Sequence, residues 1–91
     1  LIGADGVSMD FGPSASDLES AHLHRMVVAN ATSTILLVDH SKLGNASLFQ
    51  IVEWDRINKM VTDCAPDEDW MEFAKQRNIE LIYPGSKSSE K

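Results

Sequence analysis

The sequence contains a single cysteine, Cys64, among its 91 residues. One thiol excludes a disulfide within the chain, and no cysteine and histidine lie at the spacing of a zinc-binding motif. We therefore expect a reducing, cytoplasmic setting and neither a metal nor another cofactor. Because Cys64 has no basic neighbour in the sequence to activate its thiol, we interpret it as a small, buried or partly buried apolar residue.

Long apolar runs and an excess of basic residues are also missing. The longest apolar segments, 35–38 and the mixed stretch 26–29, are much shorter than the roughly 20 residues that span a bilayer. Eight Lys and Arg residues are scattered among fourteen Asp and Glu residues, which gives a net charge of −6. Binding to a nucleic-acid backbone requires clustered basic residues. We therefore expect this chain neither to enter a membrane nor to bind DNA by itself.

Short apolar segments alternate with helical patterns along the chain. Residues 34–39 are almost continuously apolar, which is typical of a parallel strand covered on both faces. The alternation predicts an α/β domain, with a mainly parallel sheet and flanking helices. Strands are expected at 1–4, 34–39, 47–52, 59–63 and 79–83, helices at 17–31 and 67–77, and a loop at 5–16.

The chain length fits one domain. We expect it to comprise residues 1–85 and to be followed by a disordered polar tail, 86–91, which is too polar to order itself. Since the chain begins with a leucine inside an apparent strand, we interpret it as a piece of a longer protein.

Several residues have predicted structural roles. Ser16 and Glu19 have the spacing of a capping box for the first helix. Trp70 is expected in the core, whereas Trp54, between two acidic residues, is either a core residue or an interface residue. The first helix is expected to pack through a mixed face formed by Leu18, Ala21, His22, Arg25, Met26 and Ala29.

Polar residues follow three of the expected strands. Asp5 and Gly6 follow the first strand, residues 39–42 (Asp-His-Ser-Lys) follow the second, and Asp63 follows a third. Ligands of open parallel sheets bind beyond the carboxyl ends of the strands. The sequence therefore predicts that these residues converge at one edge and form a site there.

Each of these groups has two interpretations. Lys42 presents a compact charge suited to a phosphate or carboxylate, and Asp39 suits a sugar hydroxyl. Alternatively, Asp39 caps the next turn and Lys42 is solvated.

The 5–16 loop precedes a helix whose first turn is acidic, which disfavours the binding of an anion there. The loop is therefore expected either to bind sugar hydroxyl groups or simply to cap the helix. The two helical histidines, His22 and His24, are best interpreted as solvated or partly packed side chains.

The residues also resemble a known family. Gly3-Ala4-Asp5-Gly6-Val7, the helix with Glu19 and Arg25, Asp39-His40-Ser41-Lys42-Leu43-Gly44 and Val61-Thr62-Asp63 are similar to the second half of the effector domain of DeoR-family transcription regulators. Asn58 departs from the family pattern, in which an aspartate is usual. The resemblance extends over residues 1–83.

This resemblance implies a fold like that of ribose-5-phosphate isomerase and glucosamine-6-phosphate deaminase. It also implies a sensor that binds a phosphorylated sugar and is part of a homo-oligomeric repressor. Operator DNA would be bound by an N-terminal helix-turn-helix domain absent from this chain. The effector-binding residues implied are Asp5, Gly6, Asp39 and Lys42, with Arg25 as a weaker candidate.

The same resemblance bears on the choice between sensor and enzyme. An ungapped alignment places His24 where the isomerase has its catalytic glutamate, whereas the lysine is retained as Lys42. Loss of the base with retention of the lysine favours a sensor. The alternatives are a sugar-phosphate isomerase or deaminase fragment, or an oligomerisation domain that would use Trp54.

Overall fold

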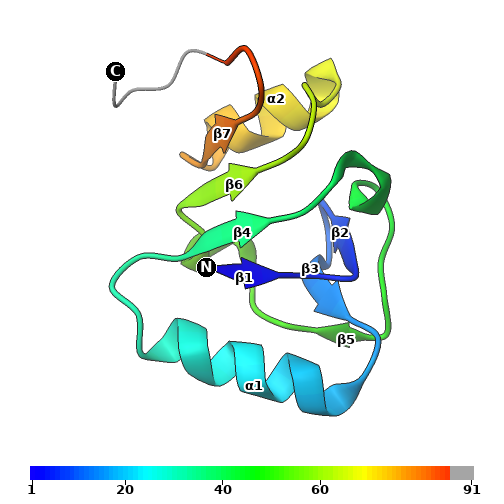
Figure 1. Ribbon diagram of the computed structural model, residues 1–91, viewed down its shortest axis with the longest axis vertical. Coiled ribbons are helices and arrows are strands. Elements are labelled where there is room, and N and C mark those ends of the chain that lie inside the picture. Colours follow the sequence, from blue (N-terminus) through cyan, green and yellow to red (C-terminus); the bar gives the residue numbers. More distant parts are fainter. Residues whose placement is uncertain (87–91) are drawn as a thin grey trace.

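Four parallel strands form the larger sheet of the computed structural model, which describes residues 1–86 (Figure 1). Their order is β1-β4-β6-β7, and α2 (Glu68–Gln76) connects the last two. The predicted α/β fold with a mainly parallel sheet is therefore confirmed. The strands are β1 (Ile2–Gly3), β4 (Ile35–Leu37), β6 (Lys59–Val61) and β7 (Glu80–Ile82).

A second, antiparallel sheet has three short strands. β2 (Gly6–Ser8) and β3 (Gly12–Ala15) form a hairpin, and β3 also pairs with β5 (Phe49–Gln50). The prediction of a loop at residues 5–16 is therefore wrong. The hairpin gives little sequence signal because its strands are short and are rich in Gly, Ser and Pro. Gly12 has a positive φ of 81°, a conformation that favours glycine.

The larger sheet is well buried on only one of its faces. Leu36 and its cross-strand neighbour Met60 are 0% and 1% exposed, whereas Leu37, on the opposite face of β4, is 49% exposed. The prediction of a strand covered on both faces is therefore wrong. The reason is that α1 (Leu18–Ala29) packs against β3 and β5, and α2 packs against β7, so neither helix lies over Leu37.

The three central aromatic residues form a cluster of edge-to-face contacts. The rings of Trp54 and Phe73 have centroids 5.2 Å apart, and those of Trp54 and Trp70 are 6.0 Å apart. Trp54 begins the short 3-10 helix η2 (Trp54–Arg56) and its Nε1–H donates to the Ser8 carbonyl at 3.0 Å. The core position of Trp70 is confirmed, whereas the interface interpretation of Trp54 is wrong, because the indole is buried and hydrogen-bonded.

Helix α1 differs from the prediction in its start and in its packed face. Asp17 is the N-cap, and its carboxylate accepts from the Ser20 N–H at 3.1 Å, so the capping box from Ser16 is wrong. The buried residues are Ala21 and Val28. The predicted packed face also included two residues that prove to be 61% and 52% exposed, Leu18 and Met26.

The end of the described chain is a turn after β7. The Ser86 N–H donates to the Tyr83 carbonyl at 2.9 Å, and the Ser86 hydroxyl accepts from the Tyr83 N–H at 3.1 Å. The rest of the predicted tail, 87–91, lies outside the described residues. Within residues 1–86, no helix has the length and apolar character needed to cross a membrane.

The one-sided burial of the sheet yields a test. Leu36→Ala should lower the free energy of unfolding by about 2–5 kcal/mol, because it leaves a cavity in the core. The matched variant Leu37→Ala should cost less than about 1 kcal/mol, since its side chain is half exposed. Urea denaturation of both variants measures these values, and equal losses would contradict the described burial.

Candidate functional site

The loops that follow β1, β4 and β6 converge at one edge of the larger sheet, as the sequence predicted. The clearest link joins the last two loops. The His40 backbone N–H donates to Asp63 Oδ1 at 2.7 Å, and His40 Nδ1 lies 3.0 Å from Asp63 Oδ2. The hydrogen bonds from His40 lower the pKa of the Asp63 carboxyl group. Asp63 is therefore ionised at neutral pH and joins the two loops.

Asp39 shapes the loop after β4. Its carboxylate caps the 3-10 helix η1 (His40–Lys42) by accepting from the Ser41 N–H at 2.9 Å and from the Ser41 hydroxyl. These bonds lower the pKa of Asp39, as does the charge of Lys42. Capping, one of the two interpretations of Asp39, is thus confirmed. Both of these hydrogen bonds end on Asp39 Oδ1. Asp39 Oδ2 accepts no hydrogen bond from residues 1–86, and the Asp39 side chain is exposed to solvent.

Asp5 lies after β1 and is bound in a similar way. Its Oδ2 accepts from the Ser16 N–H at 2.8 Å and from the Ser16 hydroxyl at 2.9 Å. These two bonds lower the pKa of Asp5, and the charges of Lys42 and His24 act in the same direction. Ser16, which was expected to cap α1, therefore holds the carboxylate of Asp5 in place. The hydrogen bonds within residues 1–86 leave Asp5 Oδ1 without a partner.

Lys42 is the basic residue of this edge and the last residue of η1. Its charge helps to lower the pKa of Asp5 and of Asp39, although the hydrogen bonds from Ser16 and Ser41 have the larger effect. The side chain is partly buried and forms no hydrogen bond or ion pair with any other residue in the described part of the chain. The ammonium group of Lys42 is therefore free to bind an anion.

The β2–β3 hairpin holds the 40–47 loop in place. The Gly44 N–H donates to the Val7 carbonyl at 2.7 Å, and the Ser47 N–H donates to the buried Ser14 hydroxyl at 2.8 Å. A Cβ atom on Gly6 would lie 2.7 Å from the Asn45 carbonyl oxygen. The structure therefore gives Gly6 a packing role beneath this loop, and its predicted effector role stays a prediction.

Helix α1 contributes two basic residues that were considered from the sequence. Arg25 donates from Nε to the Ile51 carbonyl at 2.9 Å and from Nη2 to the Gln50 carbonyl, so its guanidinium holds α1 to β5. Within residues 1–86 it pairs with none of the edge aspartates. His24 is partly buried, and its Nδ1 is buried without a hydrogen-bond partner in the described chain.

Two residues at the edge were not assigned correctly from the sequence. Cys64 is exposed, so its interpretation as a buried apolar residue is wrong. The reason is that β6 ends at Val61 and the chain bends at Asp63 and Cys64. His40 was given no role, although the Asp-His-Ser-Lys segment was singled out. Its position directly after a strand-end aspartate was the available signal.

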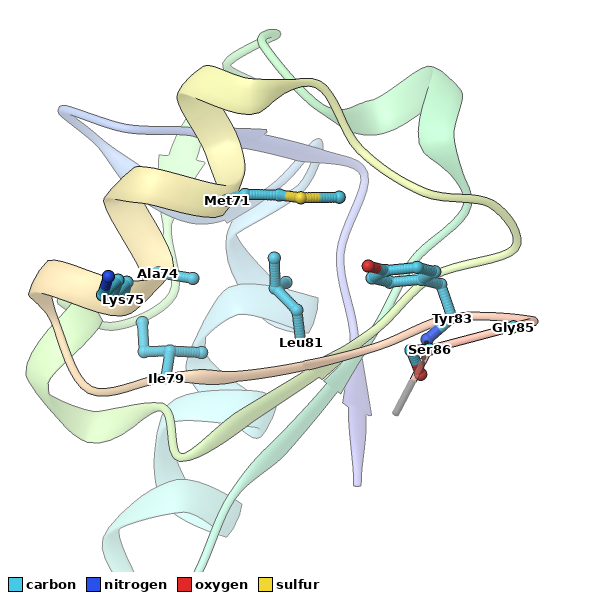
Figure 2. Close-up of a pocket in the computed structure, with 8 residues that line it drawn as sticks. All are labelled: Met71, Ala74, Lys75, Ile79, Leu81, Tyr83, Gly85 and Ser86. Carbon is cyan, nitrogen blue, oxygen red and sulfur yellow. Dashed lines mark hydrogen bonds between the residues drawn. The ribbon is translucent and has the colours of Figure 1, made fainter. Parts of the chain in front are cut away.

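A separate cavity of about 440 Å³ lies between α2 and β7 (Figure 2). Figure 2 shows Met71, Ala74 and Lys75 on α2, and Leu81 and Tyr83 on the chain segment opposite the helix. None of the convergent aspartates lines this cavity, and most of its labelled side chains are apolar. We therefore place the candidate site at the strand-end loops.

The pKa shift of Asp5 leads to a test of the edge. Ser16→Ala should raise this pKa towards its ordinary value without restoring it, because the backbone bond from residue 16 remains. A carboxyl group has a lower pKa in the folded protein than in the unfolded chain, where it is about 3.9, when the fold favours its ionised form. Such a group stabilises the folded protein at pH values above about 3.9. This contribution is lost as the pH falls through the folded pKa.

The stability difference between the parent and Ser16→Ala should therefore shrink on acidification below about pH 4. Carbon-13 NMR titration of the Asp5 carboxyl and urea denaturation at several pH values measure the two effects. Ser33→Ala, at an exposed serine, should leave the Asp5 titration unchanged. An unchanged Asp5 titration in Ser16→Ala would contradict the described bond.

Comparison with known proteins agrees with this architecture. A profile of the DeoR C terminal sensor domain matches residues 1–64. The chain is 32% identical over 82 residues to the HTH-type transcriptional repressor GlcR of Bacillus subtilis (90% of this chain, 31% of the repressor). It is 29% identical over 80 residues to the Deoxyribose operon repressor of Escherichia coli K12 (88% and 32%).

A further relative is the Glycerol-3-phosphate regulon repressor of Escherichia coli K12, which is 24% identical over 81 residues (89% of this chain, 32% of the repressor). The chain thus spans about a third of the length of these curated relatives. The family resemblance noted in the sequence is confirmed, and this chain belongs to the DeoR C-terminal sensor domain family.

Proposed function

We propose that the chain forms part of an effector site for a phosphorylated sugar in a DeoR-type transcriptional repressor. The observation that carries this proposal is that Asp5 follows β1 while Asp39 and Lys42 follow β4, so that the parallel pairing of these strands brings them to one edge of the sheet. An ammonium group suits a phosphate, and carboxylate oxygens accept hydrogen bonds from sugar hydroxyls. The names of two relatives, which refer to deoxyribose and to glycerol 3-phosphate, support this chemistry.

The effector-binding set is proposed as Asp5, Gly6, Asp39 and Lys42, with Arg25 the weakest member. Asp5 Oδ1 and Asp39 Oδ2, which have no partner within residues 1–86, would receive hydroxyl groups. Because Asp63 adds a further negative charge, Lys42 alone cannot neutralise a phosphate at this edge. Additional donors to the phosphate would come from parts of the sensor domain outside this chain.

We further propose that this domain senses its ligand and does not transform it. Isomerisation of a sugar phosphate needs a general base whose pKa lies near the operating pH. The pKa of each edge aspartate, Asp5, Asp39 and Asp63, is lowered, which makes these carboxylates weak bases. Ligand binding would alter the affinity of a separate helix-turn-helix domain for operator DNA in the cytoplasm.

The role of Lys42 can be tested by ligand binding. We expect thermal-shift and calorimetric screens to select a phosphorylated ligand over its unphosphorylated parent. The panel pairs 2-deoxyribose 5-phosphate, glycerol 3-phosphate and glucose 6-phosphate with the corresponding free compounds. Lys42→Ala should weaken binding about 10–100-fold, the usual effect of losing a charged hydrogen bond.

Lys75→Ala is the matched control, because Lys75 is exposed on α2 and lines the separate cavity. It should leave the affinity unchanged. Equal affinities of the parent and Lys42→Ala would contradict the proposal. If the 91-residue chain binds none of these compounds, the same comparison is made in the full-length regulator, where loss of selectivity for phosphorylated ligands would also contradict it.

We also propose that the regulator is a homo-oligomer. Exposed apolar residues on α1 support this, because Leu23, Met26 and Val27 are 60%, 52% and 45% exposed and recur at helical spacing. Leu23→Glu should reduce self-association measured by light scattering after size-exclusion chromatography. Leu48→Glu, at a residue 73% exposed outside α1, is the control and should not. Identical masses for both variants and the parent would contradict a role for α1.

A further inference from the structure

Three metal-binding side chains meet where the loops after β4 and β6 touch. A ring nitrogen of His40, a carboxylate oxygen of Asp63 and the Sγ atom of Cys64 all lie within 4.8 Å of one another. We propose that these three residues form a binding site for Zn²⁺. The sequence alone predicted no metal, because these ligands come from two separate loops and no local spacing reveals them.

The donor set fits zinc better than the common hard cations. Imidazole nitrogen, thiolate sulfur and carboxylate oxygen are its usual ligands, whereas Mg²⁺ and Ca²⁺ prefer oxygen alone. A tetrahedral ion about 2.0 Å from nitrogen and oxygen places those two atoms about 3.3 Å apart. His40 Nδ1 and Asp63 Oδ2 are 3.0 Å apart, so small movements of the exposed side chains accommodate the ion.

The backbone already holds two of the three ligands in place. The His40 N–H donates to Asp63 Oδ1 at 2.7 Å, which fixes that carboxylate against the start of η1. Asp39 caps η1 through Ser41 and so orders the turn that carries His40. Cys64 follows Asp63 directly, which keeps its thiol beside the pair. The loss of side-chain freedom on binding is therefore small for two of the ligands.

The local charge also favours a cation. The negative charge of Asp63 acts on the Asp39 carboxyl group, and the chain carries a net charge of −6. The ion would take the place of the contact between His40 and Asp63, and Cys64 would bind it as the thiolate.

Three ligands leave one tetrahedral position open. All three residues are exposed, so water can fill that position. Zinc sites with three protein ligands and an open position exchange their fourth ligand, in contrast to closed structural sites. The proposed site therefore needs no sugar phosphate, and its test is independent of the effector proposal.

Cobalt substitution and thiol protection test the site in the reduced 91-residue chain, in a buffer without phosphate or sugars. Co²⁺ should produce a near-ultraviolet absorption band from thiolate coordination, and Zn²⁺ should remove it by displacement. Zn²⁺ should also slow the alkylation of Cys64 at least about tenfold, and a chelator should reverse this. Because Cys64 is the single cysteine, alkylation reports on this residue alone.

Variants separate the site from general metal binding. Cys64→Ser should abolish the cobalt band, and His40→Ala should weaken Zn²⁺ binding at least about tenfold in calorimetry, since even outer-shell changes cost 10–100-fold. His22→Ala, at an exposed histidine on α1, should bind like the parent. Circular dichroism checks that each variant is folded. Absence of the cobalt band in the parent, or alkylation unaffected by Zn²⁺, would overturn the proposal without use of any variant.

Discussion

The candidate site depends on the parallel pairing of β4 between β1 and β6. This arrangement brings the ends of three strands to one edge, although Asp5, Asp39 and Asp63 are far apart in the sequence. Two further interactions fix the positions of the loops at this edge. The His40–Asp63 contact joins the loops after β4 and β6, and the β2–β3 hairpin binds the 40–47 loop. A parallel sheet thus determines where the site lies, and a small antiparallel sheet determines its shape.

Much of this arrangement was accessible from the sequence. Apolar runs followed by aspartate predicted the strands and the polar residues at their ends, because both are local features, and the alternation of strands and helices predicted a parallel sheet. Trp70 was assigned to the core for a similar reason, since it lies on an amphipathic helix. These signals depend on neighbours within a few residues, which is the range over which a single sequence is informative.

The remaining features depend on contacts between distant residues. Ser16 has the spacing of a capping residue, yet it binds Asp5, because the hairpin returns the chain to the end of β1. Trp54 lies between acidic residues but is buried by Trp70 and Phe73. The clustering of Cys64 with His40 follows from the register of β4 and β6. No pattern within a short window encodes any of these three outcomes.

The same edge serves two proposed ligands of opposite charge through different residues. The effector proposal uses Lys42 with Asp5 and Asp39, whereas the metal proposal uses His40 and Cys64 with Asp63. The carboxylates suit both proposed ligands, because they accept hydrogen bonds from sugar hydroxyl groups and also attract a metal cation. Hydrogen bonds from Ser16, Ser41 and His40 keep them ionised, and this is also why they are poor general bases.

An effector that binds at the strand-end loops should perturb the backbone amides of those loops. We would titrate the nitrogen-15-labelled chain with 2-deoxyribose 5-phosphate and with glycerol 3-phosphate and follow the amides by NMR. We expect the largest amide shifts at Asp5, Ser16, residues 39–42 and Asp63. Shifts concentrated instead on Met71, Lys75 and Tyr83, around the cavity between α2 and β7, would contradict it.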